Sequence, residues 1–338
     1  RSPLRYHLGL LAAVGALAAL AVGLELRARG GSHPGGATAE LELAAALGGG
    51  DDAGFLRATT PRPFAFPTDH GAHDGFRTEW WYVTGNLFAA DGRAFGVQLT
   101  FFRNALVAGG AASPSRWRSH HVWMAHFALS DERRGTFRFS ERFAREAVDL
   151  AGVTAAPFRV ALEDWSLASM SPSGSDFSPL ALAARNGDFA AELTLETGKP
   201  PVLQGERGLS QKGPEPGNAS YYYSLTRLAT RGTVTVAGET VPVTGEAWLA
   251  RAWSTSALGA ELAGWDWFAL QLDDGRELMF YRLRRKDGAS DPWSRGSLVA
   301  ADGSARSLQP AEVRLTPLST WPSPTGAIYP AKWRIEVP

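Results

Sequence analysis

Cysteine does not occur among the 338 residues, which excludes disulfide bonds, thiolate metal ligands and cysteine nucleophiles. No charge of one sign is in excess, because 34 basic residues balance 34 acidic ones. A nucleic-acid-binding surface requires a concentration of Lys and Arg, so we expect no nucleic-acid partner. A P-loop, a dinucleotide-binding glycine pattern and a GxSxG nucleophile motif are also missing. We therefore expect no cofactor, and the chemistry must come from other features.

One long apolar run is present, at residues 8–24, and Arg1, Arg5 and His7 precede it. A positive flank followed by an apolar run is typical of a signal peptide or a membrane anchor. As a helix the run would span roughly 26 Å at about 1.5 Å per residue, slightly less than a bilayer core. Both alternatives stay open. The pattern predicts a signal peptide or membrane anchor at 1–26, a flexible Gly- and Ala-rich linker at 27–60, and a location in the cell envelope.

From about residue 61 the pattern is that of β-strands, since no segment keeps a helical period over the length of a helix. Short apolar stretches alternate with Asn-Gly and Asp-Gly turn signals. Many short strands with frequent turns indicate an all-β barrel or sandwich. The predicted strands are 79–89, 94–103, 120–130, 136–142, 158–163, 189–196, 221–228, 232–236, 241–249, 265–272 and 277–284.

The same aromatic hairpin occurs twice, about 185 residues apart. Each copy has a strand with a Trp-rich start, an Asp-Gly-Arg turn and a second strand with an aromatic pair followed by Arg. We interpret the recurrence in the same order as a duplicated antiparallel β-barrel with an aromatic interior. The predicted barrels span 61–232 and 233–338, and the second reads as truncated because a new strand opens near Tyr329. The two copies are Glu79–Tyr82, Asp91–Arg93 and Phe101–Arg103, and then Trp265–Phe268, Asp274–Arg276 and Phe280–Arg282.

The densest polar cluster, residues 69–74, lies just before the first Trp strand. It contains His70 and His73, and Glu79 follows shortly after. Histidine beside a carboxylate can act as a base, an acid or a metal ligand. The two histidines lack the helical spacing that makes HExxH specific for zinc. The spacing favours the alternative, a hydrogen-bonded loop that closes one end of the barrel.

A second histidine cluster, His120, His121 and His126, lies on a predicted strand. Alternation places residue 121 on one face with 123, 125, 127 and 129, and residues 120 and 126 on the other. His120 and His126 would lie about 20 Å apart, so one metal ion cannot bind both. A metal site would require His121 or His126 to meet the first cluster across strands. All seven histidines lie at or before residue 126, so a His-dependent reaction belongs to the first barrel or its interface.

In the second hairpin, Asp266 lies between Trp265 and Trp267 and points to the opposite face. If that face is the interior, Asp266 is a buried acid with a raised pKa that can protonate a substrate. If the Trp face is the interior, Asp266 is a solvated surface residue. Arg103 and Arg282 end the matching strands, and their duplication indicates a structural role such as closing a barrel end.

The segment Asp69–Leu87 resembles the signature of the AttH-like family, also called hydroxyneurosporene-synthase-like or carotenoid 1,2-hydratase-like. Four later stretches match in the same order: Gly96–Arg103, His121–Asp131, Tyr221–Leu228 and Gly264–Gly275. The resemblance covers about residues 61–338 and implies two tandem lipocalin-like barrels. It also implies a predicted secreted hydrolase, encoded in some cases beside ABC-transporter permeases. Other members hydrate carotenoid double bonds or guide the cyclisation of polyenes.

The sequence departs from the family pattern after Gly245–Leu249. The family usually continues Asp-x-Glu-Trp, or Asp-His-x-Trp in the carotenoid hydratase branch. Here Ala250 and Ala252 replace both carboxylates, and Arg251 replaces the hydratase histidine, while Trp253 is kept. If those positions carry the chemistry, the resemblance implies that this chain is impaired as an enzyme.

Three functions follow as alternatives. The first is an exported or membrane-anchored protein that binds an apolar ligand, a lipid or isoprenoid, because 12 tryptophans and 17 phenylalanines suit an aromatic-lined cavity. The second is a hydratase or hydrolase acting on an apolar substrate. The third is an accessory protein of an ABC exporter, fixed to the membrane by the N-terminal helix.

The candidate site residues come from both predicted barrels. The two groups are expected to flank one cleft near the interface between the barrels, a common place for ligand sites. The candidate catalytic residues are His70, His73, Glu79 and Asp266. The candidate ligand-binding residues are Trp80, Trp81, Tyr82, Gln98, Arg103, His121, His126, Arg251, Trp253, Trp265, Trp267 and Tyr281.

Overall fold

β-Strands make up the regular structure of the protein, in agreement with the predicted all-β class. The computed structural model describes residues 52–337, apart from 111–114, 116, 118, 172–175, 257, 260, 324 and 325. The predicted signal or anchor at 1–26 and most of the linker at 27–60 lie outside the described residues. Within the described ranges the helical elements are three short 3-10 turns, and none is long and apolar enough to cross a membrane. These turns are η2 (Thr68–His70), η3 (Ala147–Asp149) and η4 (Pro310–Glu312).

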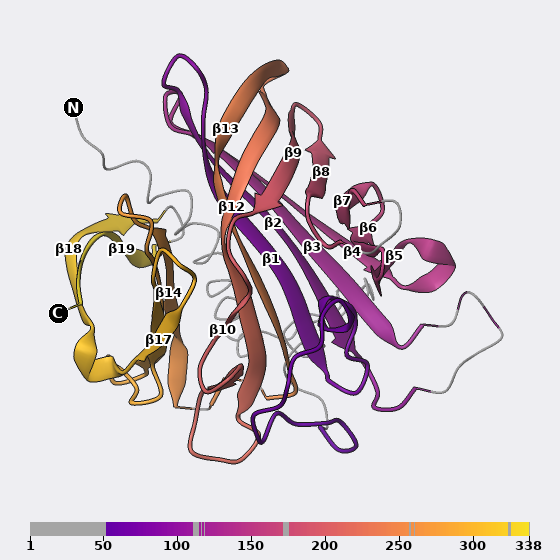
Figure 1. Ribbon diagram of the computed structural model, residues 1–338, viewed down its shortest axis with the longest axis vertical. Coiled ribbons are helices and arrows are strands. Elements are labelled where there is room, and N and C mark those ends of the chain that lie inside the picture. The colour runs from indigo at the N-terminus through magenta and orange to yellow at the C-terminus, as the bar shows by residue number, and fades with distance from the viewer. Residues whose placement is uncertain are drawn as a thin grey trace, which may run out of the picture. The chain divides into compact units, whose positions relative to one another are not determined.

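One antiparallel sheet contains thirteen strands (Figure 1). Eleven of them follow one another in a continuous order, and two short strands, β10 (Val202–Leu203) and β11 (Leu209–Gln211), both pair with β12. The continuous order is β4 (Thr136–Arg145), β3 (His121–Asp131), β2 (Ala94–Ala105), β1 (Thr78–Phe88), β13 (Glu239–Ser254), β12 (Ala219–Val236), β9 (Phe189–Thr197), β8 (Leu180–Asn186), β7 (Trp165–Ser169), β6 (Phe158–Leu162) and β5 (Ala151–Ala155).

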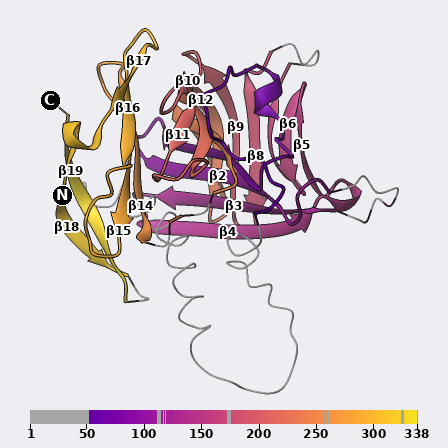
Figure 2. The same ribbon diagram turned by 90° about the horizontal axis from the view of Figure 1, so that it is seen from below.

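This large sheet curls into a nearly closed barrel (Figure 2). β6, near one end of the strand order, contacts β2, β3 and β4 at the other end. Side chains alternate along each strand, so every second residue points inward. On β1 the inward set includes Trp81, Val83 and Leu87, which are buried in a core that ten strands of the barrel share. Large side chains such as Trp123 and Trp165 have no exposed surface, so they fill this interior.

A second sheet of four strands packs on the outside of β1, β12 and β13. Its strands are β14 (Leu262–Gln271), β15 (Glu277–Arg285), β16 (Arg295–Val299) and β17 (Ala305–Leu308). Aromatic side chains from both sheets meet between them, and we call this set the inter-sheet aromatic layer. It consists of Trp80, Tyr82, Tyr222, Trp248, Trp267 and Tyr281. β18 (Arg314–Pro322) and β19 (Ile328–Glu336) form a separate antiparallel hairpin in a second compact unit.

A buried carboxylate joins the two sheets at one end of the layer. Glu277 on β15 has no exposed surface, and both of its oxygens lie 2.9 Å from Lys199 Nζ. Arg227 Nε, on β12, donates to Glu277 Oε1 at 2.6 Å. A buried charge is tolerated only when it is paired and hydrogen-bonded, so these contacts hold β15 against the barrel.

The repeated hairpins predicted from the sequence are β1–β2 and β14–β15. Their turns have the same construction. Asp91 and Asp274 each accept a hydrogen bond from the backbone N–H two residues later, at 3.0 and 3.1 Å. Gly92 and Gly275 have φ of 77° and 80°, a conformation that glycine adopts without steric cost. The Asp-Gly-Arg sequence therefore forms the same turn twice.

Each predicted strand corresponds to an observed one, and the segments 221–228 and 232–236 are parts of a single strand, β12. The expected boundary between residues 232 and 233 falls inside β12. β13 pairs with β12 on one side and with β1 on the other, so its residues belong to the large sheet. The strands β5, β7, β8, β10, β11 and β16–β18 had no counterpart among the predicted strands.

Candidate functional site

A cluster of charged side chains occupies the inner face of the barrel at one end. Glu79 on β1 shares the inward face with Trp81, and β2 and β13 supply Arg103 and Arg251. Strand register places Glu79 directly opposite Arg103 on one side and opposite Trp253 on the other. The segment before β1 supplies the remaining members. We call this set the barrel-end cluster: Arg62, Asp69, His73, Glu79, Arg103 and Arg251.

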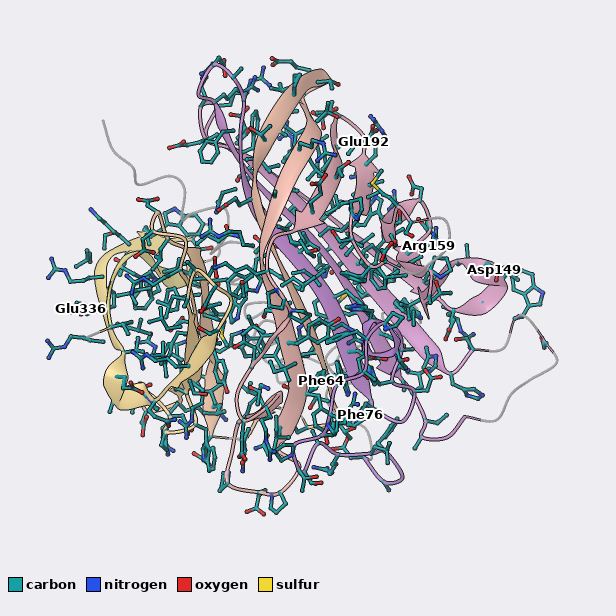
Figure 3. All side chains as sticks on the ribbon, viewed as in Figure 1. Phe64, Phe76, Asp149, Arg159, Glu192 and Glu336 are labelled. Atoms are coloured by element: carbon teal, nitrogen blue, oxygen red, sulfur yellow. The ribbon has the colours of Figure 1, made fainter. Side chains whose placement is uncertain are left out.

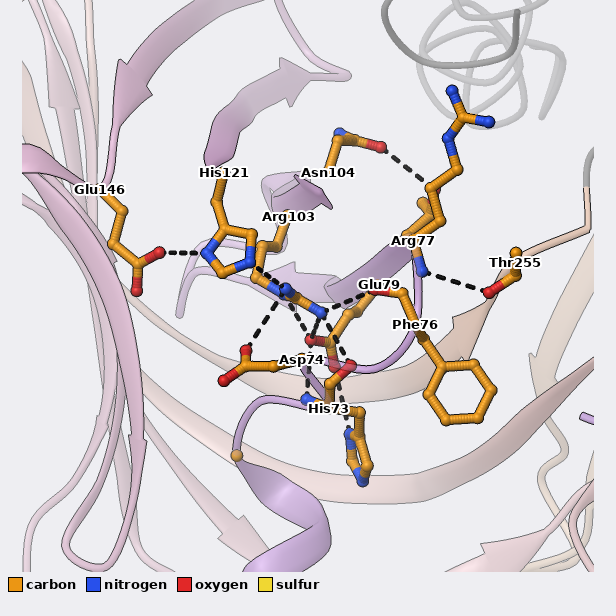
Figure 4. Close-up of polar contacts among 12 residues, drawn as sticks. His73, Asp74, Phe76, Arg77, Glu79, Arg103, Asn104, His121, Glu146 and Thr255 are labelled. Carbon is orange, nitrogen blue, oxygen red and sulfur yellow. Dashed lines mark hydrogen bonds and ion pairs between the residues drawn. The ribbon is translucent and has the colours of Figure 1, made fainter. Parts of the chain in front are cut away.

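Glu79 is the centre of the barrel-end cluster and is fully buried (Figure 4). Its Oε1 accepts hydrogen bonds from Arg103 Nε at 2.5 Å and from the His73 backbone N–H at 2.9 Å. Its Oε2 accepts a bond from Arg251 Nη2 and lies 3.1 Å from His73 Nδ1. Burial opposes ionisation, but the charge of Arg251, the bond from His73 and the charge of Arg103 outweigh it and hold the Glu79 pKa well below its usual range. These contacts favour the ionised form of Glu79.

Arg103 connects Glu79 to the loop and to the neighbouring strand. Its Nη2 donates to the carbonyl oxygens of His73 at 2.9 Å and Phe76 at 3.1 Å. Its Nη1 lies 2.8 Å from His121 Nε2. Arginine can only donate, so His121 Nε2 accepts this bond and the ring proton lies on Nδ1, which faces Glu146. His121 thus joins the network through Arg103 (Figure 4).

His73 bridges the two carboxylates of the cluster. Its Nε2 lies 3.0 Å from Asp69 Oδ1, and its ring stacks on Trp253 at 3.7 Å between centroids. Asp69 Oδ1 also accepts a bond from Arg62 Nη2 at 2.6 Å. Burial raises the pKa of Asp69, but the bonds from His73, Arg62 and the Ala65 backbone outweigh it and lower the pKa to about 2.

His70 lies in an aromatic environment beside the cluster. Its Nδ1 is 2.6 Å from the Tyr223 hydroxyl, and its ring stacks on Phe177 at 3.7 Å. Burial and the nearby charge of Arg251 lower the pKa of His70 to about 3, so the ring is neutral near pH 7. Its carbonyl accepts a bond from Trp81 Nε1 at 2.9 Å. These contacts fix the loop to the barrel wall.

Aromatic side chains cover the cluster at the same end of β12. Phe64 and Phe76, labelled in Figure 3, both pack edge-on against Tyr221, at 6.3 and 5.8 Å. The guanidinium of Arg62 lies 5.3 Å from the ring centroids of Tyr221 and Trp253. The geometry therefore favours the loop that closes one barrel end over a reactive site. Among the described residues, no group of three His, Asp or Glu side chains could hold a metal ion.

The structure brings His70, His73 and Glu79 together but separates Asp266 from them. His70, His73 and Glu79 lie at the barrel end, where Arg251 and Trp253 join them. Asp266 lies in the four-stranded sheet, where Arg282 Nε donates to it at 2.8 Å. The expected single cleft shared by both groups is therefore wrong for Asp266, because the Trp face of β14, and not the Asp face, packs against the barrel. Arg284 is a second cation near the Asp266 carboxylate.

The two repeated hairpins share a cross-strand ion pair as well as the aromatic pattern. Glu79 and Arg103 are direct cross-strand partners in β1–β2, and Asp266 and Arg282 are direct partners in β14–β15. Direct cross-strand neighbours of opposite charge stabilise an antiparallel pair. The structural role predicted for the duplicated arginines agrees with this geometry.

The other candidate ligand-binding residues divide between the two faces of the barrel wall. Trp80, Tyr82, Trp267 and Tyr281 lie in the inter-sheet aromatic layer. Trp81 stacks on Trp123 inside the barrel, and Trp265 is 45% exposed. Gln98 Nε2 donates a hydrogen bond to Thr100 Oγ1 at 2.9 Å. His126 Nε2 lies 3.0 Å from Glu141 Oε2 on the outer face of the barrel.

The inter-sheet aromatic layer combines rings with a few buried polar atoms. Trp267 meets Tyr82 edge-on at 5.5 Å and Trp248 at 6.4 Å. Trp248 is 2% exposed, and its indole N–H has no hydrogen-bond partner among the described residues. Ala250 and Ala252 follow Trp248 on the same face of β13, so the positions where the family resemblance places carboxylates lie in this layer.

The sequence reasoning missed Trp248, Tyr222 and Lys212. Alternation supplied a signal for Trp248, because it lies two residues before Ala250 and must share its face. Tyr222 lies directly across from Ala252 in the β12–β13 ladder. No local pattern marks Lys212, because the Tyr281 ring beside it comes from the other sheet.

The fold and its layer define an all-β protein in which a nearly closed barrel carries a second sheet over an aromatic surface. The chain belongs to the AttH-like family, which matches residues 57–338. A solved structure from Nitrosomonas europaea, described as an AttH protein, is 36% identical, with a TM-score of 0.73 and coverage of 84% of both chains.

Kievitone hydratase from Nectria haematococca is a more distant structural neighbour. It is 14% identical, with a TM-score of 0.60, over 84% of this chain and 80% of that chain. At this identity the likeness concerns the fold alone. No curated protein matches the sequence.

Proposed function

We propose that the protein binds an apolar small molecule in the inter-sheet aromatic layer. The observation that carries the proposal is the composition of the layer: six aromatic rings, two small side chains between them and a buried indole N–H without a partner. Ligand sites are typically apolar, with a few polar groups that fix orientation. A buried donor without an acceptor is unfavourable, and a ligand oxygen would satisfy it.

The aromatic side chains inside the barrel are a less suitable ligand site than those between the sheets. Trp81, Trp123, Trp165 and Phe127 are fully buried there and pack against one another. Protein cores are close-packed, and these side chains act as core rather than as a lining. The layer between the sheets is a separate aromatic cluster that two structural elements enclose.

The geometry favours binding over hydration or hydrolysis. An alkene hydratase requires a proton donor beside the double bond. Glu79 is ionised between two arginines, Asp266 is bound by arginine, and positions 250 and 252 are alanine. None of these four positions supplies a carboxylic acid to the aromatic layer.

A neutral fluorescent probe, N-phenyl-1-naphthylamine, tests the proposal by titration of the full chain. We expect saturable binding that Ala250→Leu weakens at least tenfold, since the larger side chain fills the layer. Ala305→Leu is the matched control, because Ala305 is an exposed alanine on β17 outside the layer, and the same enlargement there should leave binding unchanged. Thermal unfolding confirms that both variants are folded. No probe binding by the wild-type chain, or equal binding by a folded Ala250→Leu variant, contradicts the proposal.

The repeated hairpin supports a second lipocalin-like barrel, of which β14–β17 would form part. We infer this from the two identical turns and the two cross-strand ion pairs. The envelope location and the ABC-exporter partner rest on residues 8–24 and on the family resemblance, and both stay predictions.

A further inference from the structure

We infer that the ligand of the inter-sheet aromatic layer is an amphipathic carboxylate, whose acid group binds Lys212 and the Tyr281 hydroxyl while its apolar body lies among the rings. The inference rests on the proposed binding function and names the chemical class of the ligand. It differs from the polyene and isoprenoid substrates implied by the family resemblance, because an anionic group is the feature that Lys212 recognises.

Lys212 follows β11 and is half-buried beside the aromatic layer. Its Nζ donates to the Ser210 carbonyl at 3.3 Å and to the Ser220 hydroxyl, and it lies 5.9 Å from the ring centroid of Tyr281. No carboxylate among the described residues forms an ion pair with it. A partly desolvated cation without a counter-ion is unfavourable, so the site would gain from a ligand anion.

Tyr281 connects Lys212 with the aromatic layer. It is 5% exposed, and its hydroxyl lies 3.1 Å from Ser210 Oγ and 3.2 Å from the Gln211 carbonyl. Burial raises the pKa of Tyr281 to about 12, so the hydroxyl keeps its proton. It donates this proton to the Gln211 carbonyl, and a bound carboxylate would accept it in place of that carbonyl. The ring belongs to the same apolar cluster as Trp267.

Ser220 is the part of this site that the barrel supplies. It lies two residues before Tyr222 on β12, so both side chains project from the same face toward the second sheet. Lys212, Ser220 and Tyr281 thus form a polar edge on an otherwise apolar layer. Hydrogen bonds from an ammonium group to a carboxylate are short and about twice as strong as neutral ones. A single ammonium group with hydroxyl neighbours matches the single negative charge of a carboxylate.

Three twelve-carbon probes distinguish the contribution of the acid group to affinity from that of the apolar body. They are dodecanoate, dodecanol and dodecyl phosphate, each used below its micelle concentration. Displacement of N-phenyl-1-naphthylamine at pH 6.5 reports their affinities for the full chain. We expect dodecanoate to bind at least tenfold more tightly than dodecanol. Lys212→Met, which keeps the length of the side chain but removes its charge, should abolish this preference and leave dodecanol binding intact. Lys212→Arg should retain most of the preference.

Lys286→Met is the matched control, because Lys286 is an exposed lysine in a turn and its loss should not change the preference. Equal affinities of dodecanoate and dodecanol for the wild-type chain overturn the inference and leave the proposed function standing. A preference that persists in folded Lys212→Met also overturns it. Tighter binding of dodecyl phosphate than of dodecanoate, lost in Lys212→Met, overturns the carboxylate assignment. Failure of the neutral probe to bind overturns both the inference and the proposed function.

Discussion

At the scale of single residues, Glu79 shows how a buried carboxylate becomes structural. Two arginines from neighbouring strands and the backbone of the closing loop all donate to it. Both arginines are themselves fully buried, so the carboxylate and the guanidinium groups neutralise one another. Breaking a buried pair leaves an uncompensated charge, which is far more unfavourable than the net gain from forming the pair.

Glu79→Gln is therefore expected to destabilise the protein by about 3–5 kcal/mol, because Arg103 and Arg251 lose their common counter-ion inside the barrel. Denaturant unfolding at pH 7 measures the free energy of unfolding. Asp74→Asn is the control, since Asp74 is an exposed carboxylate 3.4 Å from the same Arg103, and its replacement should change stability by less than about 1 kcal/mol. A similar small loss for Glu79→Gln would contradict the structural role.

Asp69 predicts how stability depends on pH. Its folded pKa is lowered to about 2 from the ordinary value of 3.8, so the ionised form is favoured in the folded state. Ionised Asp69 adds roughly 2 kcal/mol to the free energy of unfolding. This contribution is fully present above about pH 4 and is lost as the pH falls toward 2. Unfolding measured from pH 2 to 7 should give a flatter profile for Asp69→Asn than for the wild-type chain. Parallel profiles would show that other groups carry the acid sensitivity.

At the scale of secondary-structure elements, the repeated hairpin has two different environments. β1–β2 lies within the barrel wall, with its ion pair inside, whereas β14–β15 packs its Trp face on the barrel and directs its ion pair away. The attachment between the two elements depends on the buried Glu277, which binds Lys199 and Arg227. The aromatic layer exists only while these elements remain in contact.

Glu277→Gln should loosen the second sheet without unfolding the barrel. Removing the negative charge leaves Lys199 and Arg227 without their shared partner, so the contact between β15 and the barrel weakens. Hydrogen–deuterium exchange should increase in β14–β17 and stay unchanged in β1–β3. Asp274→Asn, at an exposed turn, serves as the control. Equal acceleration in both sheets would indicate that they unfold as one unit.

At the scale of the whole molecule, the apolar run at residues 8–24 predicts export or anchoring. Residues 1–60 fused to alkaline phosphatase, an enzyme that needs disulfide bonds formed outside the cytoplasm, should give active enzyme in a bacterial host. Leu17→Arg places a charge in the middle of the run and should abolish the activity. Lys286→Met in a fusion of the full chain is a charge-changing control outside the run. Activity that survives Leu17→Arg would disprove a role for the run in export.

Much of the architecture was predictable from the sequence, because it depends on local rules. Alternation located the long strands, and the Asp-Gly-Arg turns located both hairpins, since glycine there adopts a positive φ. The loop role of residues 69–74 was also favoured by their spacing alone. The assignment of residues 123, 125, 127 and 129 to one face of β3 agrees with their burial in the barrel core.

Tertiary structure decided which face of each strand is inside and which distant residues meet. Alternation separates two faces but does not tell which one is buried, so the role of Asp266 depended on how β14 packs. The pairing of Glu79 with Arg251 depends on β13 returning beside β1 after most of the barrel has been formed. The surroundings of Lys212 depend on contact with β15 from the other sheet. Such contacts join residues far apart in the chain, and no local pattern specifies them.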